Sequence, residues 1–176
     1  MLRIIGGSRG EIDEVMPAIL GYALTLCDAE FGILFEHREK ACFHASFSKG
    51  LPSAFRTWLA DQGEFPVDPA TALGRMEATR AVVNIVDVRA EAVFRSSDPL
   101  RHATAVLGGA RSFVAIPMLA AERLVGAFTI YRQSVRPFNA QATSLARLFA
   151  EQSVVAIENA RIVSELRSAR QAPMRS

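Results

Sequence analysis

The chain has 176 residues, half of them hydrophobic, so it is long enough to bury one sizeable core, and one domain is expected. Twenty basic and eighteen acidic residues are interspersed and leave a net charge of +2, which predicts no nucleic-acid partner and no membrane-surface partner. Two cysteines are too few for a disulfide scaffold, and no run of about 18 apolar residues predicts a membrane span. Residues 1–5 are too short for the apolar part of a secretory signal. We therefore expect a soluble, cytoplasmic protein.

The first predicted element is a helix. Apolar residues recur at helical spacing from Ile12 to Cys27, and the helix is expected to end near residue 28. Its start has two possible positions. Ser8 opens a Ser-x-x-Glu capping box, whereas Pro17 would lose a hydrogen bond deep in a helix and favours a start near Asp13 or a kink.

A β-hairpin is predicted next, because the apolar runs 31–36 and 41–47 flank a short polar stretch. Alternation in the second run predicts that Phe43, Ala45 and Phe47 share one face of the strand and that His44 and Ser46 lie on the other. A short helix over 53–59, an irregular loop, a helical turn over 71–79 and a third strand over 81–86 are expected to follow.

The second half of the chain predicts a short helix and a second hairpin. Asp98 is a typical N-cap and Pro99 a typical first helical residue, so a helix is expected from there to about Leu107. The runs 111–119 and 124–131 then predict two strands that are apolar on both faces. Strands of that kind need a cover on each side of their sheet.

The last predicted element is a long helix that Asn139 can cap, running from residue 140 to about 170. Leu148, Val155 and Ile162 repeat every seven residues along it, which is the spacing of a coiled-coil seam. We therefore expect a homodimer that forms through the first and last helices.

The order of these elements, together with several short strings, resembles the GAF domain family over about residues 11–170. The strings of the C-terminal half are Arg111-Ser112-Phe113-Val114-Ala115-Ile116-Pro117-Met118, Leu124-Val125-Gly126-Ala127-Phe128-Thr129-Ile130 and Ala156-Ile157-Glu158-Asn159-Ala160-Arg161. Those of the N-terminal half are Ala29-Glu30-Phe31-Gly32, Gly50-Leu51-Pro52 and Val86-Asp87-Val88.

The resemblance implies an α+β fold with a central antiparallel sheet of five to six strands, related to the PAS fold. The terminal helices would lie on one face, and loops and short helices from about residues 50–109 would cover a ligand pocket on the other. Residues 1–10 are expected to be a flexible N-terminal segment, 11–170 the sensory domain and 171–176 a disordered tail. The resemblance also implies control of an output domain, as in bacterial sensor histidine kinases and nucleotide cyclases.

Three specialised branches of that family fit the sequence poorly. The cyclic-nucleotide-binding pattern is incomplete, because Pro99 stands where that pattern has glutamate. The lid string from Leu100 to Thr104 contains no cysteine for covalent attachment of a bilin. Cys27 and Cys42 fall in a helix and a strand rather than in pocket loops, which disfavours the methionine-sulfoxide-reducing branch. We therefore predict no enzyme activity and no catalytic residue, name no cofactor, and expect no metal site.

The candidate ligand-binding residues lie on the second strand and in the segment that would form the lid. They are His44, Ser46, Phe94, Asp98, Arg101 and His102. His44 and Ser46 would line the sheet side of a pocket, and Arg101 with a helix N-terminus would favour an anionic ligand. Each residue also has an ordinary interpretation: a sheet histidine, a solvated helix face or a core aromatic residue.

Two functions remain open at this point. The chain is either a sensor that binds a small molecule and signals through its terminal helices, or a dimerisation module whose cavity is filled. A redox enzyme is the third alternative. The deciding observation is whether polar groups converge on a cavity between the sheet and the middle segment.

Overall fold

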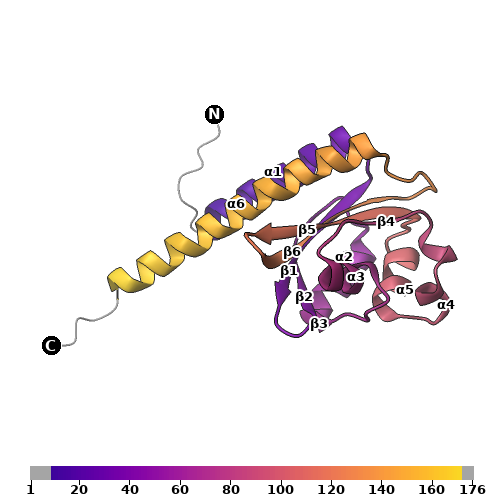
Figure 1. The fold of residues 1–176 in the computed structure, drawn as a ribbon, viewed down its shortest axis with the longest axis horizontal. Helices are drawn as coiled ribbons and strands as arrows, with labels where there is room; N and C mark the ends of the chain where they lie inside the picture. Colours follow the sequence, from indigo (N-terminus) through magenta and orange to yellow (C-terminus); the bar gives the residue numbers. More distant parts are fainter. Residues whose placement is uncertain (1–8, 172–176) are drawn as a thin grey trace.

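A computed structural model describes residues 9–171 and shows helices on both faces of one sheet (Figure 1). Most of the predicted flexible segment 1–10 and of the predicted disordered tail 171–176 lies outside the described residues, whereas residues 9, 10 and 171 belong to helices. The elements, in chain order, are α1 (Arg9–Cys27), β1 (Phe31–Arg38), β2 (Cys42–Lys49), α2 (Ser53–Gln62), β3 (Glu64–Pro66), α3 (Ala72–Thr79), β4 (Val83–Ile85), the 3₁₀ turn η1 (Val88–Ala90), α4 (Ala92–Arg95), α5 (Pro99–Val106), β5 (Ser112–Ala120), β6 (Arg123–Arg132) and α6 (Ala140–Gln171).

The six strands form one antiparallel sheet in the order β3-β2-β1-β6-β5-β4. The two predicted hairpins, β1-β2 and β5-β6, are confirmed, and β6 joins them by pairing with β1. The expected α+β class is therefore confirmed. The sheet has six strands, within the expected five to six. Sequence patterning missed β3, η1 and α4, each only three or four residues long.

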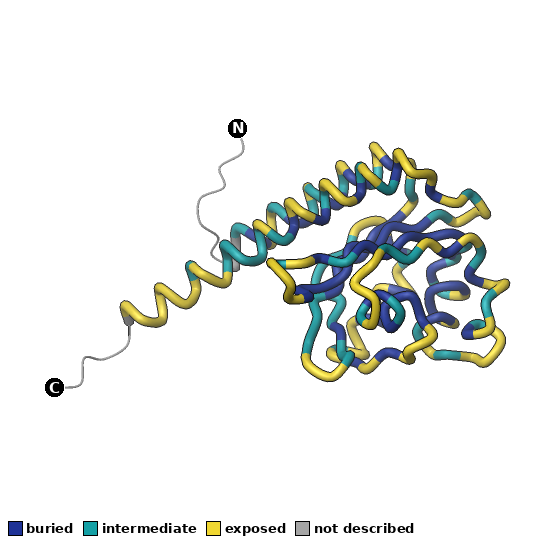
Figure 2. Tube along the Cα trace, in the orientation of Figure 1, coloured by how far each residue is buried: buried dark blue, intermediate teal, exposed yellow. Residues whose placement is uncertain are grey.

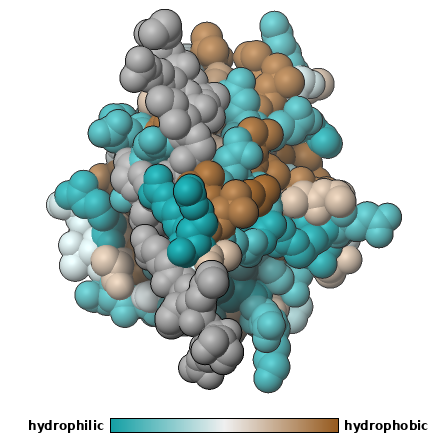
Figure 3. Space-filling view, turned by 90° about the vertical axis from the view of Figure 1, so that its left-hand side faces the viewer, coloured by the Kyte–Doolittle hydropathy of each residue, from teal (hydrophilic) through white to brown (hydrophobic). Residues whose placement is uncertain are grey.

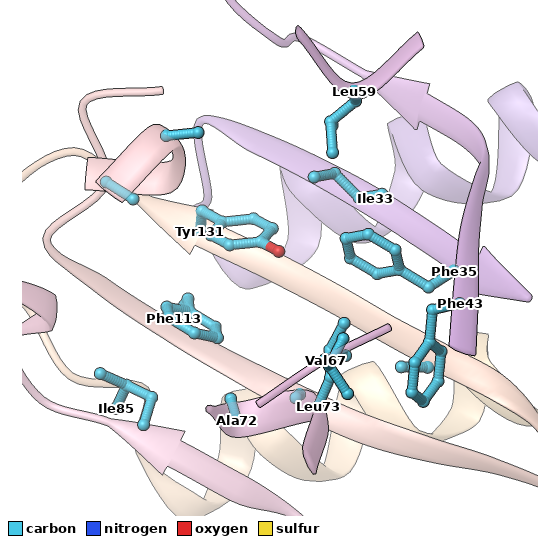
Figure 4. Close-up of a cluster of buried hydrophobic side chains, with 14 of the residues drawn as sticks. Ile33, Phe35, Phe43, Leu59, Val67, Ala72, Leu73, Ile85, Phe113 and Tyr131 are labelled. Carbon is cyan, nitrogen blue, oxygen red and sulfur yellow. The ribbon is translucent and has the colours of Figure 1, made fainter. Parts of the chain in front are cut away.

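Each face of the sheet carries its own core, as the two-sided apolar strands predicted. Strands β5 and β6 are buried along most of their length (Figure 2). One face packs against α1 and α6 through buried side chains such as Leu34, Phe128 and Ile130. The other face is covered by the segment from α2 to α5, which is called the lid here. Side chains of this core, contributed by both the sheet and the lid, are drawn in Figure 4: Ile33, Phe35, Phe43, Leu59, Val67, Ala72, Leu73, Ile85, Phe113 and Tyr131.

A β-bulge changes which face the end of β2 presents. Leu34 pairs with Phe47 and Phe35 pairs with Ala45, so Ser46 is the extra residue in the ladder. Phe43 and Ala45 accordingly belong to the lid-side core, whereas Phe47 packs on the terminal-helix side. The expectation that these three side chains share one face was wrong, because simple alternation takes no account of an inserted residue.

Local helix signals were accurate. The Asp98 carboxylate accepts a hydrogen bond from the Arg101 N–H at 2.9 Å and caps α5, with Pro99 as its first residue. The Asn139 side chain accepts from the Ala142 N–H at 2.8 Å and caps α6. Helix α1 begins at Arg9 and continues through Pro17, so the later start considered near residue 13 is wrong. No helix among residues 9–171 is long and apolar enough to cross a bilayer.

Candidate ligand cavity

A small cavity lies between the sheet and the lid, in the region where a ligand was expected. Its volume is about 20 Å³, which is room for one water-sized group. The sheet contributes lining residues from β1, β5 and β6, and the lid contributes α3 and α5. The lining residues are Phe35, Thr71, Ala72, Leu73, Leu100, Arg101, Thr104, Phe113, Thr129 and Tyr131.

Arg101 is the charged residue of this cavity, and its side chain is only 2% exposed. Its Nη1 atom donates to the Glu91 carboxylate at 3.0 Å, and its guanidinium lies over the Phe113 ring, 5.5 Å from the centroid. Glu91 also accepts from Arg75 at 2.6 Å. One carboxylate therefore serves two arginines, and the Nη2 atom of Arg101 is buried with no hydrogen-bond partner within residues 9–171.

The threonine hydroxyls of the cavity all donate to main-chain carbonyls. Thr71 donates to Asp68 O at 2.6 Å, Thr104 to Leu100 O at 2.7 Å and Thr129 to Ile33 O at 2.8 Å. Because a hydroxyl has one proton, these three side chains offer only oxygen lone pairs to a ligand. The hydrogen-bond donors left to the cavity are Arg101 and the Tyr131 hydroxyl.

Tyr131 is held rigidly in the lid-side core. Its ring stacks on Phe31 at 4.5 Å and on Phe113 at 4.9 Å between centroids. Its hydroxyl points along the sheet toward Phe35 (Figure 4). Burial raises the pKa of this hydroxyl far above its usual range, outweighing the lowering by Thr129 and Arg101, so the group is a neutral donor at physiological pH.

The structure separates the six predicted site residues into four groups. Arg101 lines the cavity, as expected. Asp98 caps α5, so the N-terminus of that helix is already satisfied by its own carboxylate and is not open to an anion. Phe94 and His102 stack on each other with ring centroids 6.2 Å apart and do not line the cavity.

His44 and Ser46 do not reach the cavity, and their expected convergence with the lid residues was wrong. Phe43 and Ala45 occupy the lid side of β2, so His44 between them faces the other side of the sheet. The Nδ1 atom of His44 lies 3.0 Å from the Ser46 hydroxyl, and the two form a local pair. Whether any of the six predicted residues binds a ligand stays a prediction.

Sequence reasoning missed the hydroxyl groups of the cavity. Thr71 was read only as the beginning of a helical turn, and Thr129 and Tyr131 only as members of an apolar strand. The signal was present in β6, where Thr129 and Tyr131 fall two residues apart and therefore share a face. Thr104, three residues after Arg101 on α5, shows the same kind of spacing.

His102 belongs instead to an open groove on the outer side of the lid, between α2 and α5. The groove has a volume of about 390 Å³ and is lined by Trp58, Ser97, Pro99, His102, Ala103, Val106 and Leu107. Its lining has no residue in common with the lining of the cavity at Arg101. It is therefore separate from the cavity at Arg101.

Within the part of the chain that the structure describes, no three histidine, cysteine or acidic side chains gather as metal ligands would. Cys27 lies beneath α6, where its thiol donates to Ala142 O at 3.6 Å and burial raises its pKa. A raised pKa keeps the thiol protonated and makes it a weaker nucleophile.

The sequence model of the GAF domain family matches residues 10–158. No curated protein matches the chain. Among solved structures, a GAF domain/HD domain protein from Geobacter sulfurreducens shares 19% identity over 86% of this chain and 94% of that one, with a TM-score of 0.71.

Two further structures have the same fold at similarly low sequence identity. The GAF domain of a phosphoenolpyruvate-protein phosphotransferase from Coxiella burnetii is 14% identical, covering 88% of this chain and 86% of that one, with a TM-score of 0.71. The phycoerythrobilin-bound GAF domain of a cyanobacterial phytochrome is 18% identical, covering 88% and 89%, with a TM-score of 0.64. Because the family model matches residues 10–158, which is most of this chain, the chain belongs to the GAF domain family.

Proposed function

We propose that this GAF domain is a regulatory module that forms a homodimer through α1 and α6 and passes a signal along α6 to an output domain. The observation that carries the proposal is a row of exposed apolar residues on α6. Leu148, Val155 and Ile162 are 55%, 54% and 46% exposed, although each is a large hydrophobic residue. Exposed apolar rows at seven-residue spacing are typical of helices that pair.

The direction of this row supports pairing with a second copy rather than packing on the sheet. Ala146, Ala150 and Ser153 are buried on the inner side of α6. At 100° per residue, Leu148 and Val155 lie nearly opposite that inner side. The row therefore points outward and would be covered only by another molecule.

Helix α1 also carries exposed apolar residues. It lies beside α6 in Figure 1, and its residues Tyr22 and Leu26, four apart on one side, are 63% and 60% exposed. Figure 3, seen from the end at which α6 projects, shows exposed apolar side chains in brown among the polar ones. A twofold dimer would bring the same patch of both copies together, so exposed apolar residues on these two helices could cover one another.

Strand β6 offers a physical connection between the cavity and these helices. Its residues Thr129 and Tyr131 line the cavity, and the alternate residues Phe128 and Ile130 pack beneath α1 and α6. A side-chain rearrangement at the cavity would therefore act on the strand that supports α6. This arrangement suits a sensor and favours a regulatory role over a catalytic one.

The dimer is tested by light scattering on Val155→Glu. We expect the wild type to be a dimer and Val155→Glu to be a folded monomer, because two buried carboxylates would face each other across the seam. Arg147→Gln is the matched control. It makes the same change of one charge unit at an exposed position of α6 outside the row and should remain dimeric. A wild type that stays monomeric at high concentration would refute the proposal.

The second proposed function is binding of a small molecule in the cavity at Arg101. It is supported by the unpartnered buried Nη2 atom of this arginine. A solved relative with the same fold is described as bound to phycoerythrobilin, so this fold can hold a ligand. The cavity of about 20 Å³ admits only a small group unless the lid moves. A binding experiment that tests this function is given below.

A further inference from the structure

We infer that the ligand class of this cavity is a small monocarboxylate, whose carboxylate group pairs with the Nη2 atom of Arg101. The inference rests on the second proposed function and adds the chemistry of the ligand. It is independent of the dimer, which has its own measurement.

The first reason is charge. Arg75 and Arg101 share the single carboxylate of Glu91, so this trio carries one uncompensated positive charge. Arg101 is almost completely buried, and it shares its one carboxylate partner with Arg75, which is 39% exposed, so the charge of Arg101 is only partly compensated. An anion with one negative charge in the cavity would compensate for it.

The second reason is the pattern of donors and acceptors. Arg101 keeps Nη2 free, and the Tyr131 hydroxyl is neutral, so two groups can donate to a carboxylate. Thr71, Thr104 and Thr129 have already donated their protons to carbonyls and repel an additional anionic oxygen. A phosphate, with more oxygen atoms and a higher charge, would lack donors here, whereas a carboxylate would not.

The third reason is the rest of the cavity wall. Phe35, Leu73, Leu100 and Phe113 are apolar and surround the polar groups. A short hydrocarbon tail would therefore be accommodated better than a second polar group. Because the cavity has room for one water-sized group, such a tail requires the lid residues Leu73 and Leu100 to shift. That shift would couple binding to the lid.

The experiment measures thermal unfolding of the full chain by circular dichroism in sodium propionate, sodium chloride, sodium phosphate and 1-propanol, with the three salts at equal ionic strength. We expect propionate to bind with a dissociation constant on the order of 1 mM, because a ligand of five non-hydrogen atoms makes few contacts. At ten times that concentration the melting temperature should rise by about 3–5 °C above the chloride sample. 1-Propanol, which has the same tail without the charge, should give no such rise.

Two variants locate the effect. Arg101→Met should weaken propionate binding at least tenfold, as measured by saturation-transfer NMR. Arg89→Met is the matched control, because it removes a lid arginine that bonds to Ala105 O outside the cavity lining, and it should bind propionate as the wild type does. Tyr131→Phe preserves the stacked ring and should weaken binding several-fold, which keeps the test decisive if Arg101→Met does not fold.

The inference is overturned if chloride, phosphate or 1-propanol stabilises the wild type as well as propionate does. It is also overturned if Arg101→Met or Tyr131→Phe binds propionate with unchanged affinity. A wild type that binds 1-propanol alone would retain a ligand cavity but exclude an anion site. A wild type that binds nothing and still dimerises would leave only the dimer function standing.

Discussion

At the scale of single residues, Gly126 marks a close approach of strands β6 and β1. It pairs with Glu36 on β1, and a Cβ atom added to it would overlap the main-chain oxygen of Phe35. The neighbouring atoms are backbone atoms of a central strand, which cannot rotate away as a side chain could. Glycine is therefore required here by space rather than by an unusual φ angle.

Gly126→Ala should consequently destabilise the fold. We expect a loss of about 2–3 kcal/mol in the free energy of unfolding, because β6 must move away from β1 to make room. Urea denaturation measures it. Gly21→Ala in α1 is the control, since the nearest atom to its added Cβ is the tip of Lys49 at 3.9 Å, and it should stabilise by about 0.5–1 kcal/mol. Equal stability of Gly126→Ala and the wild type would show that β6 and β1 leave room for a methyl group at this position.

At the scale of elements, local signals were predictable and contacts between distant segments were not. Asp98 and Asn139 cap their helices with hydrogen bonds to residues three positions later, so a short window of sequence contains the whole interaction. The bulge at Ser46 depends on the register between two strands, which alternation within one strand cannot reveal. The bulge explains the wrong face of Phe47. His44 was assigned to the wrong side of the sheet because alternation within β2 does not tell which of its two faces the lid covers.

The cavity was predictable only in part, for the same physical reason. Arg101 could be singled out as a charge on a lid helix, but its pairing with Glu91 and Arg75 joins three separate lid segments. The short strand β3 was also missed, since three residues show too little periodicity to be distinguished from a loop. The position of the cavity between the sheet and the lid followed correctly from the strands that are apolar on both faces.

The cap at Asp98 makes a prediction that separates its structural role from the ligand role first considered for it. Asp98→Ala should lower the free energy of unfolding by about 1 kcal/mol, because the Arg101 N–H loses its acceptor. Asp98→Asn should be close to the wild type, since asparagine also caps helices well. Chemical denaturation gives both values. If both variants unfolded alike and bound propionate more weakly, Asp98 would belong to the ligand site instead.

At the scale of the whole molecule, α6 has two roles along its length. Its first half packs on the sheet and on α1, whereas its final turns extend beyond the body of the domain and are exposed (Figure 2). The family match ends at residue 158, and Ala160 is the last residue of α6 that packs against the buried core. The turns that contain Ile162 and Leu166 therefore contribute nothing visible to the stability of one copy.

Removing residues 162–176 should weaken the dimer while leaving the fold of one copy intact. The deleted part takes away Ile162 and Leu166, which are exposed in one copy and would be covered in the dimer, so we expect the dimer dissociation constant to rise at least about tenfold. Analytical ultracentrifugation measures that constant.

Because dimerisation itself raises apparent stability, the effect of the truncation on the fold is measured in the Val155→Glu background, where the chain is expected to be monomeric. There the truncation should change the free energy of unfolding by less than about 0.5 kcal/mol, as exposed residues usually do. A larger loss in that background would mean that the end of α6 supports its own domain, and an unchanged dimer would place the interface nearer Leu148 and α1.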